Sequence, residues 1–271
     1  MQATQETVID VQDLVTHYDT RQILNGINLQ IYHGEIMVIM GGSGSGKSTL
    51  LRHLLGLRAP TTGSVRLLGK DINHLGSDDL QALRRNMGVA FQGGALLSSL
   101  SVGENVCLPL REHTQLDDNT IRIMSRLKLE VVNLARFEDL MPAELSGGML
   151  KRAALARAIV MDPKLLFFDE PSAGLDPVAA VELDDLILRL RDAMGMTIVV
   201  VTHELESAFK IADRITVLDQ GDILMTGTVE AVKNSDHPRI QSLLHRQPRS
   251  EAVDAEAYLN RLTGTTNGHT S

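Results

Sequence analysis

The feature that most constrains the fold is a glycine-rich segment placed directly after an unbroken apolar run. Residues 36–40 are apolar and of strand length, and residues 41–48 read Gly-Gly-Ser-Gly-Ser-Gly-Lys-Ser. Leucines at positions 50, 51, 54 and 55 then recur at helical spacing. A strand, a glycine-rich turn and a helix in this order form the context that a P-loop requires.

Each residue type in this segment suits a triphosphate. Glycines let backbone N–H groups curl around phosphate oxygens, and the helix N-terminus adds partial positive charge. Lys47 is expected to reach the β- and γ-phosphates, and the hydroxyl of Ser48 to bind Mg²⁺. We therefore predict an ATP-binding segment made of Gly41, Gly42, Ser43, Gly44, Ser45, Gly46, Lys47, Ser48 and Thr49.

A second apolar run ends in two carboxylates. Residues 165–168 read Leu-Leu-Phe-Phe and are followed by Asp169 and Glu170, which is the Walker B arrangement. Asp169 is predicted to hold Mg²⁺ through water, and Glu170 is placed to take a proton from the attacking water. With the P-loop upstream, this pair indicates an ATPase rather than a degenerate module that only assembles a complex.

A second glycine-rich helix start follows further along the chain. Ser146, Gly147 and Gly148 precede a helical stretch from Leu150 to Met161, and Ser146 is expected to cap it. The P-loop already holds the phosphates of its own nucleotide. We therefore interpret this helix start as a contact to the γ-phosphate of ATP held by another copy of the chain.

The remaining pattern alternates between short buried strands and helices, which predicts a largely parallel α/β sheet. Further strands are expected at 27–31, 65–68, 89–91 and 197–201, with a hairpin around residues 219–222 and an amphipathic helix over 183–190. The stretch from about 93 to 160 is mostly helical in pattern and is expected to be an insertion. Within it, Pro109 is expected to end one helix.

Composition narrows the class of protein. The net charge of −8 argues against binding to nucleic acid or anionic lipid by bulk charge, and the single cysteine, Cys107, excludes a disulfide framework. Residues 1–20 show no signal-peptide pattern, and the longest apolar runs are far short of the ~20 residues that span a bilayer. We therefore expect any membrane role to depend on a partner.

The ordered motifs resemble those of the ATP-binding subunits of ABC transporters. They are the P-loop, Gln92 after a strand, Leu-Ser-Gly-Gly at 145–148, Asp169-Glu170, Ala-Gly-Leu-Asp at 173–176, and His203 after a strand. The resemblance spans about residues 7–235. It implies a P-loop NTPase fold of the α/β class, with a RecA-like parallel-sheet core, an antiparallel β subdomain and an inserted α-helical subdomain at about 93–160. The nucleotide-binding domain would cover 1–245 and a tail 246–271. Within the tail, the spacing of Val253, Ala257, Tyr258 and Leu262 predicts one short helix.

The same resemblance implies roles for individual residues. Tyr18 would stack on adenine, and Asp176 would contact the opposite subunit. Gln92 would sense the γ-phosphate and Mg²⁺ and face the membrane partner, and His203 would bond the γ-phosphate. The implied catalytic set is Glu170, His203, Lys47 and Gln92, and the implied metal ligands are Ser48, Gln92 and Asp169.

One departure narrows the resemblance. Met149 stands where the common signature has Gln. The sequence around it resembles that of the ATPase subunits of bacterial lipid transporters that work with MCE proteins, and so do the sequences of residues 91–97, 99–102 and 104–106. This subgroup implies (phospho)lipid transport driven from the cytoplasmic face of the inner membrane by a peripheral homodimer. The implied partners are a permease, an MCE-type lipid-binding protein and an accessory subunit, with no nucleic acid. Residues 240–271 would reach across to the other ATPase subunit or form a disordered end.

Two alternatives stay open. One is the ATPase subunit of a small-solute transporter, since cargo contacts lie in the permease. The other is a soluble ABC-type ATPase acting on DNA or ribosomes, which several observations disfavour. Only 122 positions separate Lys47 from Asp169, too few for the long coiled coil of DNA-repair members, and the chain has one nucleotide domain where translation factors usually have two.

Overall fold

The computed structural model describes residues 6–247, and its centre is a six-stranded sheet in the order β10-β9-β3-β8-β7-β6. All neighbours are parallel except β10, which pairs antiparallel with β9. The strands are β3 (Ile36–Met40), β6 (Met87–Ala90), β7 (Leu165–Asp169), β8 (Thr197–Thr202), β9 (Arg214–Asp219) and β10 (Asp222–Gly227). Every residue of β3 and β8 is buried, as expected for strands covered on both faces. The predicted parallel α/β core is confirmed.

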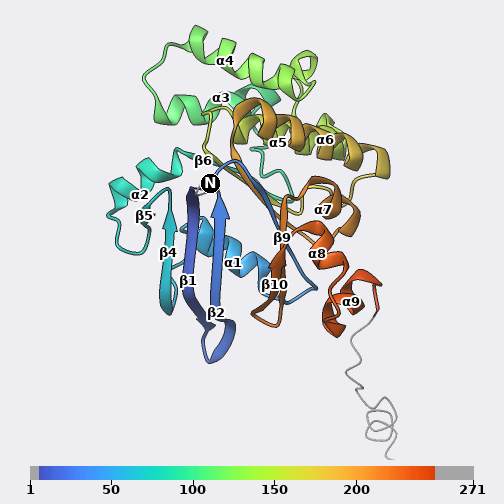
Figure 1. Cartoon of the computed structure of the whole chain (residues 1–271). Helices are drawn as coiled ribbons and strands as arrows, with labels where there is room; N and C mark the ends of the chain where they lie inside the picture. Colours follow the sequence, from blue (N-terminus) through green and yellow to red (C-terminus); the bar gives the residue numbers. More distant parts are fainter. Residues whose placement is uncertain (1–5, 248–271) are drawn as a thin grey trace, which may run out of the picture. The chain divides into compact units, whose positions relative to one another are not determined.

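A second, antiparallel sheet has the order β2-β1-β4-β5. It consists of β1 (Thr7–Tyr18), β2 (Arg21–Tyr32), β4 (Thr62–Leu67) and β5 (Lys70–Asp71). Its buried side chains share one apolar core with both the central sheet and helix α1 (Lys47–Leu54), to which α1 contributes Leu50, Leu51 and Leu54. The helix that follows the P-loop is thus held by two sheets (Figure 1).

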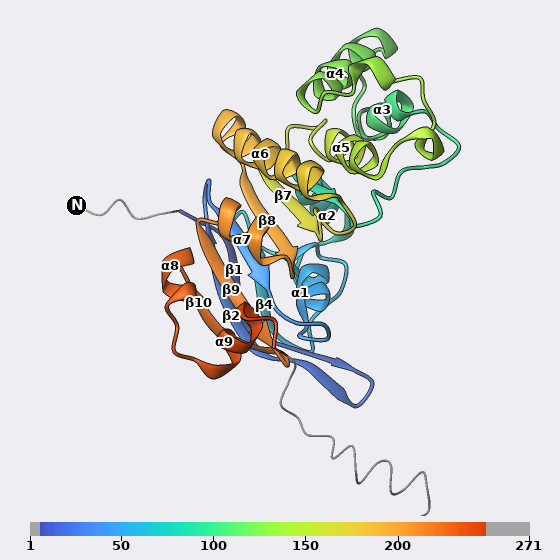
Figure 2. The ribbon, with the colours of Figure 1, turned by 90° about the vertical axis from the view of Figure 1, so that its right-hand side faces the viewer.

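Helices fill the stretch between the two glycine-rich helix starts. They are α3 (Val102–His113), α4 (Asp118–Val131), the short 3₁₀ turns η1 (Ala135–Phe137) and η2 (Pro142–Glu144), and α5 (Gly147–Ala158). Before them, α2 (Ser77–Arg84) leads into β6. In both views the group α3, α4 and α5 stands together on the side away from the antiparallel sheet (Figures 1 and 2). The helical pattern predicted for residues 93–160 is confirmed.

The prediction that Pro109 ends a helix is wrong. Pro109 lies inside α3, which continues to His113. A proline lacks the N–H that would bond to the carbonyl four residues earlier. Val106, Cys107 and Leu110 are buried on this helix, so packing against its neighbours outweighs the lost hydrogen bond.

Helices also follow the later strands. α6 (Pro177–Met194) connects β7 to β8, α7 (Leu205–Ile211) connects β8 to β9, and α8 (Val229–Lys233) follows β10. The predicted hairpin between β9 and β10 is present, and its two central residues, Gln220 and Gly221, both have positive φ (49° and 87°). Such a turn matches the twist of the flanking strands.

The chain divides into two units between Ser235 and Asp236. The second unit contains α9 (Pro238–Leu244), whose cap residue His237 accepts a hydrogen bond from the backbone N–H of Arg239. The predicted domain boundary at 245 stays a prediction, and the short helix expected around Val253–Leu262 lies outside the described residues. Within residues 6–247, no helix combines the length and apolar character needed to cross a bilayer.

Candidate active site

Four of the predicted motifs meet at one edge of the central sheet. The P-loop follows β3, Gln92 follows β6, Asp169 ends β7 with Glu170 next to it, and His203 follows β8. Because β3, β8, β7 and β6 are parallel neighbours, their carboxyl ends lie side by side, as the pairings of Met40 with Thr202 and of Asp169 with Val201 show (Figure 2). Ligands of open α/β sheets bind at this kind of edge.

Glycine is required at the P-loop for two reasons. Gly46, the residue that precedes α1, has φ 106°, and Gly44 has φ 74°, both in the left-handed region. A side chain at Gly41 would place Cβ 2.1 Å from the carbonyl oxygen of Leu218. The clash rules out any side chain at Gly41, and the left-handed backbone favours glycine at Gly44 and Gly46.

Lys47 lies across this loop. Its Nζ donates to the carbonyl oxygens of Gly41 (2.8 Å) and Gly42 (3.1 Å), and the residue is 9% exposed. Burial lowers the pKa of Lys47, while the nearby carboxylates of Glu170 and Asp169 act in the opposite direction. The ammonium group is thus held at the loop that the sequence assigns to phosphate.

Glu170 is the most closely held residue of the site. It has φ 51°, its N–H donates to the carbonyl of Val201 (2.8 Å), and its Oε2 accepts from the Thr202 hydroxyl (3.1 Å). The same Oε2 accepts from the backbone N–H of His203 (3.3 Å) and lies 2.9 Å from Nδ1 of that residue. The prediction that Glu170 and His203 belong to one site therefore has a direct geometric basis in the adjacency of β7 and β8.

Asp169 lies beside Glu170 at the end of β7. Its pKa is raised, first by burial and then by the neighbouring Glu170, although Lys47 and Arg52 oppose the shift. Two carboxylates close together in a half-buried position favour the binding of a cation, and the ammonium group of Lys47 supplies part of that positive charge.

Tyr18 lies at the end of β1 and contacts two arginines, Arg52 on α1 and Arg58 shortly after it. Its hydroxyl accepts from Nη1 of Arg52 (3.1 Å), and this hydrogen bond is the first cause of its lowered pKa. The guanidinium of Arg58 lies over the ring, 3.8 Å from its centre. The ring is thus oriented close to the helix that starts at the P-loop.

Gln92 lies on an exposed loop between β6 and α3, together with two exposed apolar residues, Phe91 (40%) and Leu97 (46%). The later part of this loop is held from inside by Asn105. The Oδ1 of this buried amide accepts from the N–H of Leu97, and its Nδ2 donates to the carbonyls of Leu97, Leu100 and Ser101 at 2.9–3.1 Å.

Ser146 and Asp176 both cap helices, and their segments lie together. Ser146 accepts from the N–H of Met149 at the start of α5, as predicted, and Asp176 accepts from the N–H groups of Val178 and Ala179 at the start of α6. A Cβ at Gly148 would lie 3.6 Å from Cβ of Ala179. In both views α5 lies apart from α1, so the two glycine-rich helix starts do not form one site within the chain (Figures 1 and 2).

Sequence patterns missed several residues that contact the site. Lys151 on α5 donates to the carbonyl of Glu170, and Arg157 on the same helix donates to the carbonyls of Gly94 and Ala95. His53 on α1 does not touch the site itself: it is fully buried and bridges Thr16 and the carbonyl of Arg58, the residue whose guanidinium lies over the Tyr18 ring. Basic residues on a helix are usually solvent-exposed, so no local signal distinguishes these.

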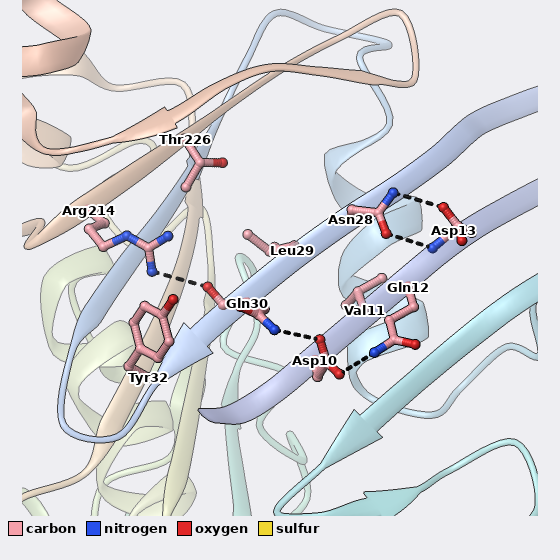
Figure 3. Close-up of a pocket in the computed structure, with 10 residues that line it drawn as sticks. All are labelled: Asp10, Val11, Gln12, Asp13, Asn28, Leu29, Gln30, Tyr32, Arg214 and Thr226. Atoms are coloured by element: carbon pink, nitrogen blue, oxygen red, sulfur yellow. Dashed lines mark hydrogen bonds between the residues drawn. The ribbon is translucent and has the colours of Figure 1, made fainter. Parts of the chain in front are cut away.

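A hollow of about 480 Å³ lies elsewhere, over β1 and β2 (Figure 3). Its polar lining residues bond to one another: Asn28 to Asp13, Gln30 to Asp10, and Arg214 to the carbonyl of Gln30. None of the predicted site residues lines it. We assign no part of the site to this hollow.

Comparisons with known proteins agree with this geometry. The family model described as "ABC transporter" matches residues 24–173. The intermembrane phospholipid transport system ATP-binding protein MlaF of Haemophilus influenzae is 41% identical over 88% of this chain and 90% of its own length. The MlaF protein of Escherichia coli K12 is 40% identical over 90% of this chain and 91% of its own length.

A second group of relatives carries another name. The probable ribonucleotide transport ATP-binding protein mkl of Mycobacterium leprae is 38% identical over 88% of this chain and 68% of its own length. Among solved structures, the chain is similar to the ATP-binding cassette MJ0796, described as a dimer in a post-hydrolysis state with ADP and Pi. The TM-score is 0.76 and the sequence identity 32%, and the match covers 82% of this chain and 98% of the MJ0796 chain. The cbiO1 protein of Clostridium perfringens matches with TM-score 0.79, 28% identity, and coverage of 95% and 100%.

Proposed function

This chain belongs to the ABC transporter family and is an ATPase, and from that premise we propose that it powers phospholipid transport through a separate permease. The observation that carries the proposal is the shared sheet edge, where the P-loop, Glu170 and His203 follow neighbouring parallel strands. The cargo is inferred from the relatives named for phospholipid transport, of which the chain covers about 90%.

In the proposed reaction, Glu170 takes the proton of the water that attacks the γ-phosphate. Among residues 6–247, the partners of its carboxylate named above all approach Oε2, so Oε1 is the oxygen we assign to that proton. His203 keeps Nδ1 on Glu170 and, because its side chain is 56% exposed, would turn Nε2 from Oε1 of Glu204, 3.5 Å away, to the γ-phosphate. Lys47 exchanges its two loop carbonyls for phosphate oxygens.

The donor set at this edge suits Mg²⁺. This ion prefers oxygen ligands and is usually held by one or two carboxylates together with substrate phosphates. Asp169, the Ser48 hydroxyl and the Gln92 amide supply such oxygens, and the neighbouring carboxylate of Glu170 adds negative charge beside Asp169. When bound, the ion would neutralise charge on the β- and γ-phosphates. No group of three or more His, Cys, Asp or Glu side chains suited to a metal is found among the described residues, so we propose no purely protein-built metal site.

Tyr18 is proposed to stack on adenine. It stands close to the P-loop helix, Arg52 bonds to its hydroxyl, and Arg58 lies over one face of its ring, so the base would stack on the opposite face. The nine residues 41–49, from Gly41 to Thr49, would surround the phosphates. These contacts would hold ATP by its base at one end and by its phosphates at the other.

A second copy of the chain is proposed to complete each site. Gly147 and Gly148 have ordinary helical φ values, and a Cβ at either would meet nothing closer than 3.6 Å. The fold of this chain therefore gives no reason for glycine there, whereas a phosphate approaching the helix start from outside does. Val178, two residues after Asp176, is 68% exposed, which suits a contact of this corner with the opposite subunit.

The permease contact is proposed at the loop of Gln92. The exposed apolar side chains of Phe91 and Leu97 lie on either side of Gln92 in the sequence and would contact the permease. Gln92 itself would reach the γ-phosphate, so the same loop would contact both the membrane partner and the nucleotide. With such a permease, the chain would lie at the cytoplasmic face of the inner membrane as a peripheral subunit. An MCE-type lipid-binding protein and an accessory subunit are proposed as further members of the complex.

The test is a mild-detergent purification from the native organism, followed by reconstitution of the captured complex. We expect a permease to co-purify and fluorescent phospholipid to move between vesicles in an ATP-dependent manner. The names of the mycobacterial relatives favour a small-solute cargo as second candidate. Transport of labelled ribonucleotides but not of phospholipid would establish it, and capture of ribosomes or DNA without any permease would reject both.

A further inference from the structure

Lys151 contacts the site from outside the sheet. It lies on α5, five residues after the cap Ser146, and its Nζ donates to the backbone carbonyl of Glu170 at 3.0 Å. Glu170 itself has φ 51°, a conformation that costs a non-glycine residue energy and persists only where its surroundings enforce it. The lysine is one of the groups that hold it there.

The other contacts of the Glu170 backbone come from nearby segments of the same edge. Its N–H donates to Val201 on β8, and its carbonyl also accepts from the N–H of Ala173 at 3.3 Å. Lys151 differs because it belongs to the helical group that stands apart from the antiparallel sheet (Figure 2). A shift of α5 against the central sheet would therefore change the Lys151 bond while leaving the other two in place.

Helix α5 is also attached to the loop of Gln92. Arg157 donates through Nη1 to the carbonyl of Ala95 (2.8 Å) and through Nη2 to that of Gly94 (3.0 Å). A Cβ at Gly94 would lie 2.6 Å from Cδ2 of Leu150, so the loop is seated against the helix. Helix α5 thus bonds to the Gln92 loop through Arg157 and to the carbonyl of Glu170 through Lys151.

We propose that Lys151 is a positioning residue for the general base, which makes the orientation of Glu170 depend on the placement of helix α5. The inference rests on the proposed role of Glu170. In this role Lys151 touches neither nucleotide nor the attacking water and acts only through the backbone of Glu170. Loss of the bond is therefore expected to affect proton transfer more than nucleotide binding.

The experiment compares Lys151→Met and Lys151→Arg with wild-type protein in steady-state ATP hydrolysis. We expect Lys151→Met to lower kcat about 10-fold or more, because small misplacements of a catalytic group are costly, and to leave KM for ATP within about twofold. Lys151→Arg keeps a cationic donor of similar reach and should retain at least about half of kcat. ATP-dependent dimers should still form in the double variant Lys151→Met with Glu170→Gln.

Lys210→Met is the matched control. Lys210 also donates to a backbone carbonyl, that of Val181 (3.2 Å), and it pairs with Asp185 (2.7 Å), both away from the sheet edge. A kcat of Lys151→Met equal to that of the control would overturn the inference, as would a loss confined to KM. If Lys151→Met does not fold, Lys151→Gln is read in the same way, since its shorter side chain does not reach the carbonyl. Absence of hydrolysis in the wild-type protein would instead reject the proposed function.

Discussion

The Nδ1 atom of His203 lies 2.9 Å from Oε2 of Glu170, although 33 positions separate the two residues in the chain. They meet because β7 and β8 are parallel neighbours and each residue directly follows its strand. The imidazole and the backbone N–H of His203 approach the same oxygen, so they fix the orientation of the carboxylate.

Glu170→Gln is expected to lower kcat by about 10²–10⁴-fold, since it removes the general base while keeping the size of the side chain. ATP binding should persist, so the variant should form dimers with ATP that the wild-type protein loses as it hydrolyses. Hydrolysis assays and size-exclusion chromatography with light scattering measure the two effects. Glu206→Gln, an exposed change on the following helix, is the control and should match the wild type. Hydrolysis by Glu170→Gln at the wild-type rate would show that another group is the base.

Tyr18→Ala is expected to weaken ATP binding by roughly 2- to 12-fold, the value of one aromatic stacking contact of about 0.5–1.5 kcal/mol. Tyr18→Phe keeps the ring and loses only the hydroxyl with its bonds to Arg52 and Thr49, so it should bind close to wild-type affinity. Binding of inorganic tripolyphosphate, which has no base, should not change in either variant. Equal weakening of ATP and tripolyphosphate would contradict the stacking role.

Gly41→Ala is expected to destabilise the protein by about 1–3 kcal/mol or more, because the new Cβ would overlap the carbonyl oxygen of Leu218 at 2.1 Å. The displaced loop should also lose most of its ATP affinity. Gly76→Ala is the control, since nothing lies within 4 Å of its Cβ and its φ is −65°. Thermal unfolding with and without nucleotide measures both variants, and similar melting temperatures for the two would be inconsistent with the clash.

The burial of His53 predicts that the free energy of unfolding depends on pH. Burial lowers its pKa, and the hydrogen bond with the Arg58 carbonyl opposes this shift. The unfolded chain, with a histidine pKa of about 6.5, therefore binds the proton before the native state does. The stability contributed by neutral His53 is complete above that pH and falls as the pH drops below it, by at most about 1.4 kcal/mol per pH unit.

His53→Gln cannot take up this proton. Its free energy of unfolding, measured by urea denaturation between pH 7.5 and 5, should therefore fall less steeply than that of the wild type. The two curves should converge as the pH decreases. Parallel curves over this range would exclude His53 as the source.

Much of the fold and site follows from local patterns. The fully buried strands β3 and β8 were predicted because both faces are apolar, and Lys47, Glu170 and His203 were placed at one edge because each follows such a strand. β1 was not predicted. Its buried residues do not alternate strictly, since its pairing with β2 has register shifts between Val11 and Val15 that break the two-residue period.

Other features depend on contacts that are remote in sequence. Pro109 remains within a helix because neighbouring helices cover the residues around it. Lys151 and Arg157 reach backbone carbonyls 19 and 62–63 positions away. Neither residue type has a preference that distinguishes such an anchor from a charge on a solvated face, so tertiary structure is needed to find them.

The buried amide of Asn105 has a mechanical consequence. Four hydrogen bonds tie Leu97, Leu100 and Ser101 to a single side chain of α3. A segment held in this way is stiff, so a force applied at Leu97 displaces the whole of α3 instead of bending the loop locally. Asn105→Ala would make residues 97–101 flexible. ATP hydrolysis would then continue, while a smaller part of the resulting movement would pass between the loop and α3.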